Sequence, residues 1–279
     1  MGKSGQGSQE KCDIGGKELI LDQPENSNIR HTIAVMSGKG GVGKSSVSAL
    51  LASSLADKGY KVGVLDADIT GPSIPKLLGV KRNVTPAPMM EDKKIIPSVS
   101  KGGIKVISLN LLIPEEDKPV VWRGPLIAGA VKQFWSDVLW GELDYLVVDL
   151  PPGTGDVPLT VMQSLPLDGL VMVSSPQDLA VMVVKKAINM AAMLDIDILG
   201  LVENMCSFKC PECNQIIKLF GKEKGETVCK ETGISFLGSL PLDPEISLLG
   251  DQGLLEDYKV TVFDLIPDLI EKRVIKNLS

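Results

Sequence analysis

Residues 38–45 of the chain have the sequence Gly-Lys-Gly-Gly-Val-Gly-Lys-Ser. This stretch matches the phosphate-loop pattern G-x-x-x-x-G-K-[ST] at every fixed position. A short apolar run rich in β-formers precedes it at 32–36, and residues 46–57 carry apolar side chains at helical spacing, namely Val47, Leu50, Leu51 and Leu55. A glycine-rich turn lets backbone N–H groups approach a phosphate closely, and the following helix adds the partial positive charge of its N-terminus. The stretch therefore predicts a nucleotide site between a strand and a helix.

Two polar side chains of this loop suit a bound nucleoside triphosphate. Lys44 is expected to neutralise the β- and γ-phosphates, and the Ser45 hydroxyl is expected to complete the shell of a Mg²⁺ ion. The other positions expected to contact the nucleotide are Gly38, Lys39, Gly40, Gly41, Val42, Gly43 and Ser46. Lys39 cannot easily fold back onto the phosphates of its own loop. Its spacing leaves two interpretations open, a contact to a nucleotide held by another subunit and a solvated lysine.

The composition indicates an α/β protein with a large core. The chain has 279 residues, of which 44% are hydrophobic and 4% aromatic, which suits a buried parallel sheet covered by helices. The net charge is −6 and no dense Lys/Arg block occurs, which disfavours nonspecific binding to nucleic acid. The polar beginning of the chain and the absence of an apolar run near the roughly 20 residues of a membrane span predict a soluble, cytoplasmic protein without a membrane partner.

Strand patterns alternate with helical patterns along the chain. Residues 1–28 are polar and lack periodicity, so we expect a flexible tail before a single P-loop domain at 29–279. Strands are predicted at 61–65, 104–109, 144–149, 169–174, 198–203 and 234–237, and helices at 125–139, 178–193, 222–231 and 263–277. An irregular excursion or small hairpin is expected over 80–103. This alternation predicts a mainly parallel sheet flanked by helices on both faces, with ligands beyond the carboxyl ends of its strands.

Three aspartates end predicted strands near the expected phosphate site. Asp149 closes an apolar strand and precedes Pro-Pro-Gly-Thr-Gly-Asp at 151–156, while Asp66 and Asp68 follow another strand. A single aspartate in such a place can simply cap a helix or form a turn. Together the three favour a magnesium and catalytic site. Asp149 would bind Mg²⁺ directly or through water, and of Asp66 and Asp68 one would order the attacking water while the other supports the metal.

Five motifs carry a family resemblance. The loop at 38–45 resembles the deviant phosphate loop of the nitrogenase-iron-protein/MinD class of ATPases. Four further stretches narrow this class: Asp-Ala-Asp-Ile-Thr-Gly-Pro-Ser-Ile-Pro at 66–75, Trp-Arg-Gly-Pro at 122–125, Asp-Leu-Pro-Pro-Gly-Thr-Gly-Asp at 149–156 and Cys-Pro-Glu-Cys at 210–213. Together, over residues 30 to 275, they resemble the Mrp/ApbC family of iron–sulfur cluster carrier ATPases.

That resemblance implies a homodimer that slowly hydrolyses ATP held at or near its interface. It implies that Lys39 reaches the partner's nucleotide, that Asp66 and Asp68 belong to a first switch, and that residues 149–156 form a second. It also implies adenine contacts from Asn204 and from the loop at 240–243, where Pro241 and Asp243 are the candidates. An asparagine amide has both a donor and an acceptor for a base edge, but position 204 alone is equally compatible with a turn residue.

The cysteines indicate a metal or cluster rather than disulfides. The chain has five, and Cys210 and Cys213 have the C-x-x-C spacing that lets two sulfurs converge on one metal. Two thiolates do not complete a four-ligand site. The resemblance implies that two cysteines from each subunit hold one [4Fe–4S] cluster, which the dimer passes to apo iron–sulfur proteins.

Cys206 and Cys229 leave other interpretations open. With the C-x-x-C pair they could form an intrachain four-sulfur zinc site, although position 229 falls in a predicted helix, where a small buried residue is the simpler explanation. A structural C-x-x-C without metal is a further alternative. Cys12 stands alone in the predicted tail, which does not support a stable cluster there.

Two other classes of ATPase share the phosphate loop. A MinD/ParA-type positioning ATPase does not need the C-x-x-C pair, and it usually has a basic or amphipathic surface that the sequence does not show. A redox ATPase like the nitrogenase iron protein has a cluster cysteine in its second switch, whereas residues 149–156 contain none. The sequence therefore favours a cluster carrier over both.

Overall fold

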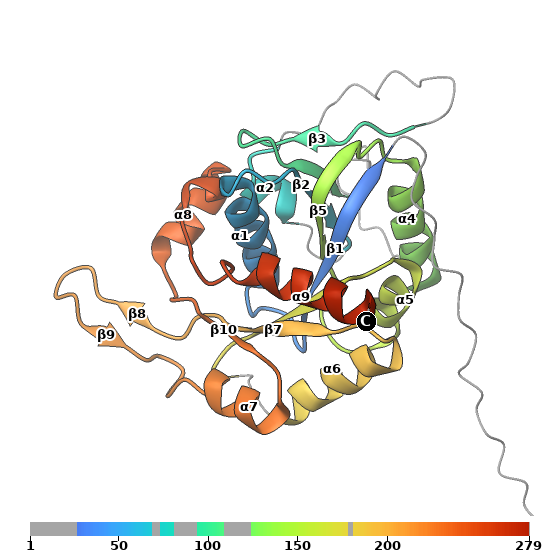
Figure 1. Ribbon diagram of the computed structural model, residues 1–279. Helices are drawn as coiled ribbons and strands as arrows, with labels where there is room; N and C mark the ends of the chain where they lie inside the picture. Colours follow the sequence, from blue (N-terminus) through green and yellow to red (C-terminus); the bar gives the residue numbers. More distant parts are fainter. Residues whose placement is uncertain (1–26, 69–72, 81–93, 109–123, 178–180, 279) are drawn as a thin grey trace, which may run out of the picture.

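The computed structural model describes residues 27–68, 73–80, 94–108, 124–177 and 181–278. Within these ranges, an eight-stranded sheet has the order β10-β7-β6-β1-β5-β2-β4-β3, and every neighbouring pair is parallel except β3 with β4 (Figure 1). Its strands are β1 (Asn28–Ser37), β2 (Val62–Asp66), β3 (Ser98–Val99), β4 (Lys105–Ser108), β5 (Glu142–Asp149), β6 (Gly169–Ser174), β7 (Ile198–Glu203) and β10 (Phe236–Ser239). The predicted α/β class with a mainly parallel sheet is confirmed.

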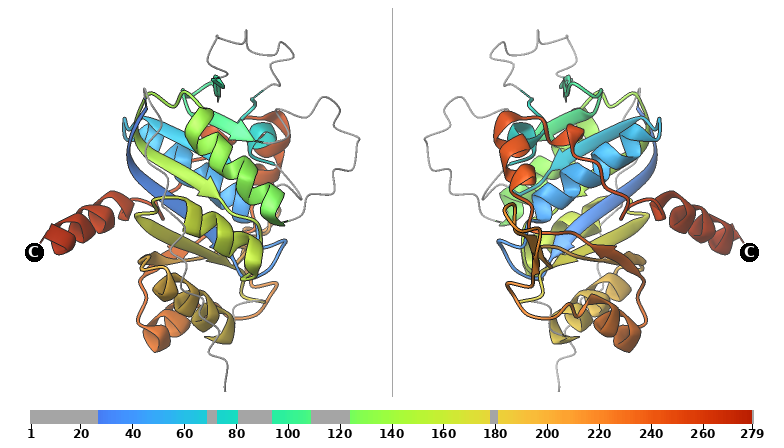
Figure 2. Two further views of the ribbon diagram at one scale, coloured as in Figure 1. Left: turned by 90° about the vertical axis from the view of Figure 1, so that its right-hand side faces the viewer. Right: turned by 90° about the vertical axis from the view of Figure 1, so that its left-hand side faces the viewer.

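Helices cover both faces of this sheet (Figures 1 and 2). One face is packed by α4 (Gly124–Asp137), α5 (Asp156–Ser164), α6 (Val181–Met193) and α7 (Gly225–Thr232). The opposite face is packed by α1 (Lys44–Asp57), α2 (Ile74–Leu77), α8 (Pro244–Gln252), the short 3₁₀ helix η1 (Leu255–Asp257) and α9 (Ile266–Leu278). No helix in the described ranges is long and apolar enough to cross a lipid bilayer.

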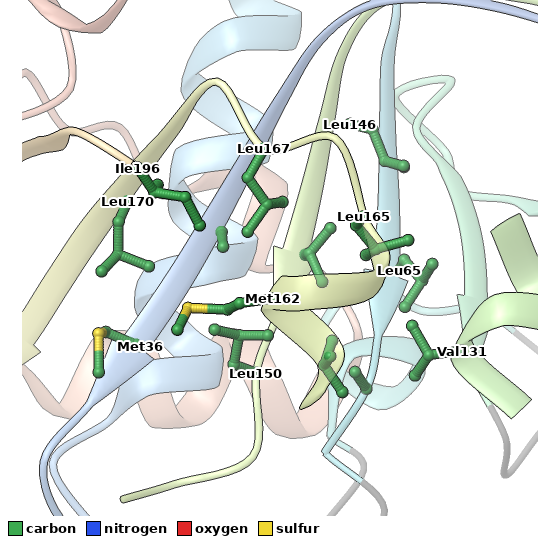
Figure 3. Packing of buried hydrophobic residues seen from close by; sticks show 14 of the residues in the cluster. Met36, Leu65, Val131, Leu146, Leu150, Met162, Leu165, Leu167, Leu170 and Ile196 are labelled. Carbon is green, nitrogen blue, oxygen red and sulfur yellow. The ribbon is translucent and has the colours of Figure 1, made fainter. Parts of the chain in front are cut away.

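Strands buried on both faces explain the continuous apolar runs of the sequence. Leu146 and Val148 of β5 point into the core under α4 and α5, while Val147 points to the opposite core under α1. Figure 3 shows the first of these cores, where Met162 of α5 and Leu165, which follows that helix, lie over strand residues. Because both faces are apolar, polar side chains gather at the carboxyl ends of the strands, where α/β proteins bind their ligands.

A small two-stranded hairpin projects from the body of the domain (Figure 1). It consists of β8 (Phe208–Lys209) and β9 (Ile216–Ile217), paired antiparallel. The hairpin lies between β7 and α7 in the chain, and its turn carries Cys210 and Cys213. Its apolar side chains at 216, 217, 219 and 220 are exposed rather than packed in either core.

Two glycines bring α2 and α8 into backbone contact. Gly79 has φ +62° and Gly253 has φ +70°. A Cβ on Gly79 would lie 2.4 Å from the Gly253 carbonyl oxygen, and a Cβ on Gly253 would lie 2.4 Å from the Gly79 Cα. An ion pair between Lys76 and Asp251, 2.7 Å long, lies beside this contact. Only glycine can occupy either position without separating the two helices.

Most predicted elements are present, with shifted ends. The predicted strands at 169–174 and 198–203 match β6 and β7 at both ends. The helix predicted at 222–231 begins only at Gly225, and the one predicted at 263–277 begins at Ile266. Helices α2, α5 and α8 and the β8–β9 hairpin are not among the predicted elements. The predicted tail up to residue 26, most of the excursion at 80–103 and the Trp-Arg part of the 122–125 motif lie outside the described residues.

Candidate functional site

The phosphate loop connects β1 to α1 as predicted. β1 ends at Ser37 and α1 begins at Lys44, so residues 38–43 form the turn between them. Gly41 and Gly43 have φ values of +83° and +80°, which L-residues with a side chain rarely adopt. A Cβ on Gly43 would also lie 2.3 Å from Asn204 Nδ2. The positive φ angle alone explains why position 41 is glycine. At position 43 the positive φ angle and the lack of room for a Cβ atom both require glycine.

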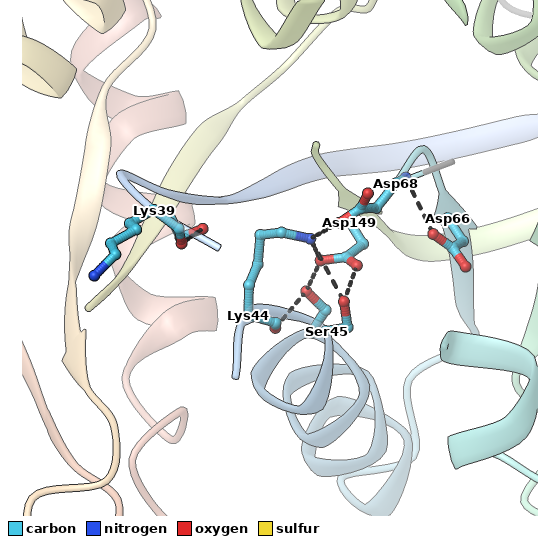
Figure 4. A network of polar contacts seen from close by, with 8 residues as sticks. Lys39, Lys44, Ser45, Asp66, Asp68 and Asp149 are labelled. Atoms are coloured by element: carbon cyan, nitrogen blue, oxygen red, sulfur yellow. Dashed lines mark hydrogen bonds and ion pairs between the residues drawn. The ribbon is translucent and has the colours of Figure 1, made fainter. Parts of the chain in front are cut away.

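Five side chains meet where β5 ends beside the first turn of α1 (Figure 4). Lys44 Nζ lies 2.9 Å from Asp149 Oδ1 and 3.3 Å from Asp68 Oδ2. The Ser45 hydroxyl donates to Asp149 Oδ2 at 2.6 Å, and the Ser48 hydroxyl donates to Asp149 Oδ1 at 2.6 Å. Asp149 is fully buried and Lys44 is only 5% exposed. The predicted Lys44, Ser45, Asp149 and Asp68 groups are thus brought together. Ser48 was not predicted, although it follows Lys44 by one helical turn.

Asp66 is held beside this cluster by strand register. It is the last residue of β2 and lies directly opposite Asp149 of β5. Its Oδ1 accepts a hydrogen bond from the Asp68 backbone N–H at 3.1 Å. By strict hydrogen-bond geometry its Oδ2 is buried without a partner among the described residues, as is the hydroxyl of Ser108 on neighbouring β4, although Ser108 lies near enough to lower the pKa of Asp66. Burial, followed by the negative charge of Asp149, raises the pKa of Asp66 well above its usual value, and Lys44 opposes this only partly.

These groups form a donor set that fits Mg²⁺. Ser45, Asp66 and Asp149 offer hydroxyl and carboxylate oxygens, which are the ligands that this ion prefers. The unpartnered Oδ2 of Asp66 and its raised pKa both indicate a site where negative charge is undercompensated. A divalent cation would relieve that imbalance. The magnesium assignment of the three residues stays a prediction that the donor chemistry supports.

Lys39 points away from the cluster around Lys44 and Asp149 (Figure 4). The residue lines a pocket of about 200 Å³ together with Gly38, Val42, Ser174 and Val183. α6 packs closely against this part of the loop, because a Cβ on Gly38 would lie 2.2 Å from Val183 Cγ1. The two lysines of the loop therefore face different directions. A role for Lys39 at a partner's nucleotide stays a prediction.

The predicted second switch leaves β5 beside the phosphate loop. Gly153 has φ +97° and donates its backbone N–H to the Ser37 carbonyl at 2.8 Å. Gly40 lies close to Pro152, since a Cβ on that glycine would be 3.9 Å from the proline ring. The loop after Asp149 is thus bonded to the residue that precedes the phosphate loop. Of the predicted first switch, residues 69–72 lie outside the described residues.

Asn204 contacts the phosphate loop directly. Its side-chain Nδ2 donates to the Val42 carbonyl at 2.9 Å, and its backbone N–H donates to the Ser174 carbonyl at 2.7 Å. An amide has a second N–H and a carbonyl oxygen to offer a base. The structure therefore places Asn204 at the phosphate loop, while its contact with adenine stays a prediction.

The loop at 240–243 is anchored to the end of β7. Leu240 N–H donates to the Glu203 carbonyl at 2.9 Å, and Leu242 N–H donates to the Ser207 carbonyl at 2.7 Å. Asp243 caps α8 by accepting from Glu245 N–H at 2.9 Å, and it also accepts from the Tyr258 hydroxyl at 2.9 Å. Helix capping thus accounts for this aspartate. The predicted adenine contacts of Pro241 and Asp243 remain predictions.

The cysteines fall into two environments. Cys210 is partly exposed and Cys213 exposed at the hairpin turn, whereas Cys206 and Cys229 are buried. Hydrogen bonds from the backbone N–H groups of Cys213 and Glu212 lower the pKa of Cys210. Burial raises the pKa of Cys206 to about 12 and that of Cys229 to about 11. A thiol that sheds its proton readily is suited to bind metal, and among the four cysteines that the structure describes it is the hairpin's Cys210 whose pKa is lowered.

The intrachain zinc interpretation is not supported. The described residues contain no group of three or more His, Cys, Asp or Glu side chains arranged to hold a metal ion. Cys206 and Cys229 are buried in the domain, so they do not join the exposed pair. Cys12 lies outside the described residues. The hairpin therefore offers two thiols per chain, which is half of a four-ligand site.

Comparison with known proteins agrees with this geometry. The family named ParA and described as NUBPL iron-transfer P-loop NTPase matches residues 28–270. An iron-sulfur cluster carrier protein of Methanocaldococcus jannaschii is 52% identical over 85% of this chain and 83% of its own. The cytosolic Fe-S cluster assembly factor CFD1 of Eremothecium gossypii is 40% identical over 88% of this chain and 90% of its own.

A solved structure shows the same fold at substantial identity. The nucleotide-binding protein of Archaeoglobus fulgidus, determined in complex with ADP, is 45% identical and superimposes with a TM-score of 0.73, covering 86% of this chain and 93% of its own. The match of the family over residues 28–270 includes the phosphate loop, the strand-end aspartates and the cysteine hairpin. This chain belongs to the family of NUBPL iron-transfer P-loop NTPases.

Proposed function

We propose that the protein is an ATP-hydrolysing iron–sulfur cluster carrier that holds one [4Fe–4S] cluster between two copies of the chain and transfers it to apo-proteins. The observation that carries this proposal is the C-x-x-C pair at the turn of an exposed hairpin on a P-loop domain. Its relatives named iron-sulfur cluster carrier protein support the nature of the cargo. An exposed site suits a cluster that must be handed on, because the recipient's thiolates have to reach it.

The nucleotide half of the proposal rests on the cluster around Asp149. Lys44 would exchange its ion pair with Asp149 and Asp68 for the β- and γ-phosphates when ATP binds. Mg²⁺, when bound, would neutralise the developing charge at the phosphates, held by Ser45, Asp149 and Asp66. Asp68, which Lys44 now holds by its carboxylate, would be released to orient the attacking water. The Gly153–Ser37 hydrogen bond would let the second switch respond when the γ-phosphate leaves.

The stoichiometry of thiols supports a dimer. A cubane cluster takes four thiolate ligands, and each hairpin presents Cys210 and Cys213 only. A two-fold axis between two hairpins would supply four. We place this dimer in the cytoplasm, in line with the relative named as a cytosolic assembly factor, and its proposed partners are apo iron–sulfur proteins rather than nucleic acid or membrane.

Anaerobic reconstitution tests the proposal. Wild-type protein incubated with iron and sulfide should take up about one four-iron cluster per dimer, and it should run as a dimer in anaerobic gel filtration. Cys210→Ala should lose the cluster and its visible absorption. Cys229→Ala is the matched control, because it removes a buried thiol of raised pKa. It should keep the wild-type iron content.

Two results would count against the proposal. Full iron content in the Cys210→Ala protein would show that the cluster is bound elsewhere. Protein isolated without oxygen that contains stoichiometric zinc and takes up no iron would favour a structural metal site instead. Transfer is tested separately by mixing the loaded dimer with an apo-ferredoxin. After the two proteins are separated, the visible absorbance of the ferredoxin shows how much cluster it has received.

A further inference from the structure

The last residue of β7 carries a buried charge with two backbone donors. Glu203 is fully buried, and its carboxylate accepts hydrogen bonds from Lys224 N–H and Gly225 N–H, both at 3.0 Å. These amides open α7, so the carboxylate also faces the positive end of that helix. A buried carboxylate is stable only when its oxygens are satisfied in this way. The Glu203 carboxylate therefore bonds the start of α7 to the end of β7.

Glu203 also bonds to the beginning of the segment at 205–224, which contains the cysteine hairpin. The Glu203 carbonyl accepts from Leu240 N–H at 2.9 Å and from the Cys206 thiol at 2.8 Å. Cys206 N–H in turn donates to the Leu240 carbonyl at 3.0 Å. The chain leaves β7 through these contacts and returns at Lys224. Both ends of the segment at 205–224, which presents the C-x-x-C pair, are consequently fixed at Glu203.

The neighbouring side chain binds the nucleotide loop. Asn204 Nδ2 donates to the Val42 carbonyl at 2.9 Å, and it lies so close to Gly43 that no Cβ fits there. Two successive residues at one strand end thus hold two different parts of the molecule. The side chain of Asn204 holds the phosphate loop, and that of Glu203 holds the exit of the cysteine hairpin.

We infer that Glu203 is a positioning residue through which nucleotide occupancy of the phosphate loop controls the geometry of the Cys210–Cys213 pair. This inference rests on the proposed function for its biological meaning, since it adds a means of regulation to the same two sites. A nucleotide that displaces the Val42 carbonyl or recruits the Asn204 amide shifts the end of β7. The Glu203 carboxylate moves with that strand end, and Lys224 and Gly225 move with the carboxylate. The hairpin then changes its orientation relative to the domain.

The test measures this coupling without iron. Reduced, cluster-free protein is treated with iodoacetamide with and without saturating Mg-ADP, and alkylation rates at Cys210 and Cys213 are followed by peptide mass spectrometry. In the wild type, nucleotide should change the rate at one or both sites by about fivefold or more. In Glu203→Gln the alkylation rate at each cysteine should be about the same with and without nucleotide. The amide NH₂ of glutamine replaces one acceptor oxygen and faces a backbone N–H, so the link to α7 is broken.

Two further variants separate positioning from a general loss of charge. Glu203→Asp keeps the carboxylate and should recover part of the nucleotide effect. Glu226→Gln removes an exposed carboxylate in the first turn of the same helix, where it pairs with Lys230 at 3.8 Å. This control should retain the full wild-type effect. A Glu203→Gln protein that keeps the wild-type ratio of rates, or a wild type whose rates do not respond to nucleotide, overturns the inference.

A measurement on the wild type covers the case in which Glu203→Gln does not fold. Hydrogen exchange at the Lys224 and Gly225 amides should change when Mg-ADP binds, since both donate to the Glu203 carboxylate. If Mg-ADP slows hydrogen exchange in the phosphate loop but leaves exchange at the Lys224 and Gly225 amides unchanged, the inference is also overturned. Neither experiment contains a cluster. Failure of the coupling therefore leaves the reconstitution result intact, and failure of reconstitution leaves the coupling measurable.

Discussion

Ser45 and Asp149, two residues expected to share one Mg²⁺, are in direct contact: the Ser45 hydroxyl donates to Asp149 Oδ2 at 2.6 Å. The strand end and the helix start are therefore bonded to each other through residues that the chain itself provides. Ser48 and Lys44 bind the other carboxylate oxygen, so Asp149 is fixed from three directions. Such preorganisation reduces the rearrangement needed to bind a metal–nucleotide complex.

Ser45→Ala should weaken Mg²⁺-dependent nucleotide binding more than binding in EDTA. The variant removes one oxygen donor but leaves Ser48 and Lys44 on Asp149, so we expect the affinity for Mg-ADP to fall about tenfold or more. Isothermal titration with and without Mg²⁺ measures both affinities. Ser53→Ala is the matched control, because that hydroxyl donates to the Ala49 carbonyl within the same helix at 2.8 Å. Equal losses in both buffers would contradict the magnesium role.

Asp66→Asn should stabilise the nucleotide-free protein at neutral and alkaline pH. A carboxyl whose pKa is higher in the folded state than its usual 3.8 binds its proton more tightly when folded. The free energy of unfolding therefore falls as the pH rises from about 4 through the folded pKa. Asparagine removes that penalty and can still accept from Asp68 N–H.

Thermal unfolding in Mg²⁺-free buffer at a series of pH values measures this effect. The Tm gain of Asp66→Asn should be largest above the folded pKa and should shrink toward pH 4. Saturating Mg²⁺ and nucleotide should reverse the sign, because the wild type then gains a metal ligand that the variant lacks. A gain independent of pH would contradict the raised pKa as its cause.

Cys210 should be alkylated in the native protein far faster than the buried thiols. The thiolate is the reacting form, and N–H groups of the turn lower the pKa of Cys210 while burial raises that of Cys206 to about 12 and of Cys229 to about 11. The rate at Cys210 should level off at a lower pH than for an ordinary thiol. Mass spectrometry after timed iodoacetamide treatment at several pH values measures it. If Cys206 in the native protein were alkylated as fast as Cys210, the two cysteines would not lie in different environments. The urea-unfolded protein is the reference, in which the alkylation rates of all these cysteines should become similar.

Lys39 and Lys44 should complement each other between subunits. The Lys39→Ala variant keeps Lys44, which contacts Asp149. The Lys44→Ala variant keeps Lys39, which points away from Asp149. If Lys39 serves the partner's nucleotide, a mixed dimer contains one intact site. An equal mixture of the two inactive variants should then regain about a quarter of the wild-type ATPase rate. A rate equal to the average of the separate variants would assign Lys39 to its own subunit.

Gly79→Ala should destabilise the protein more than Gly59→Ala. Both glycines have positive φ, +62° and +88°, so both variants incur the cost of a left-handed residue, about 1 kcal/mol. A Cβ at position 59 meets no atom within 4 Å, whereas one at position 79 lies 2.4 Å from the Gly253 carbonyl oxygen. We expect about 3 kcal/mol in total for Gly79→Ala. Urea unfolding of the two variants measures the difference, and equal costs would show that the helices separate freely.

The sequence determines the sheet better than its connections. The strands β6 and β7 are buried on both faces, so unbroken apolar runs mark their ends. α5 could not be predicted, because Pro158 and the glycines before Asp156 hide its start; proline is tolerated in a first turn, but the pattern resembles a loop. The hairpin strands, β8 and β9, are two residues long and too short for a periodicity to appear.

In the functional site, too, the residues in local motifs could be predicted, whereas contacts between distant parts of the chain could not. The phosphate loop, Asp66, Asp68 and Asp149 are local motifs at strand ends, and the structure brings all of them together except Lys39, which points elsewhere. Ser48 could have been found, because a helix places the fourth residue after Lys44 on the same side. Glu203 could not, since its partner amides lie 21 and 22 residues further along the chain. No local pattern marks a contact of that separation.

The hairpin interrupts a crossover that is otherwise ordinary. Because Glu203 brings the ends of the segment at 205–224 together, β7, α7 and β10 could follow one another through a short loop without disturbing the sheet. Cys210 and Cys213 thus lie in a segment that could be removed while β7, α7 and β10 stay connected. Grafting this segment onto the matching crossover of a cluster-free P-loop protein, with a glutamate at the strand end, is then a realistic design route to a new thiolate site.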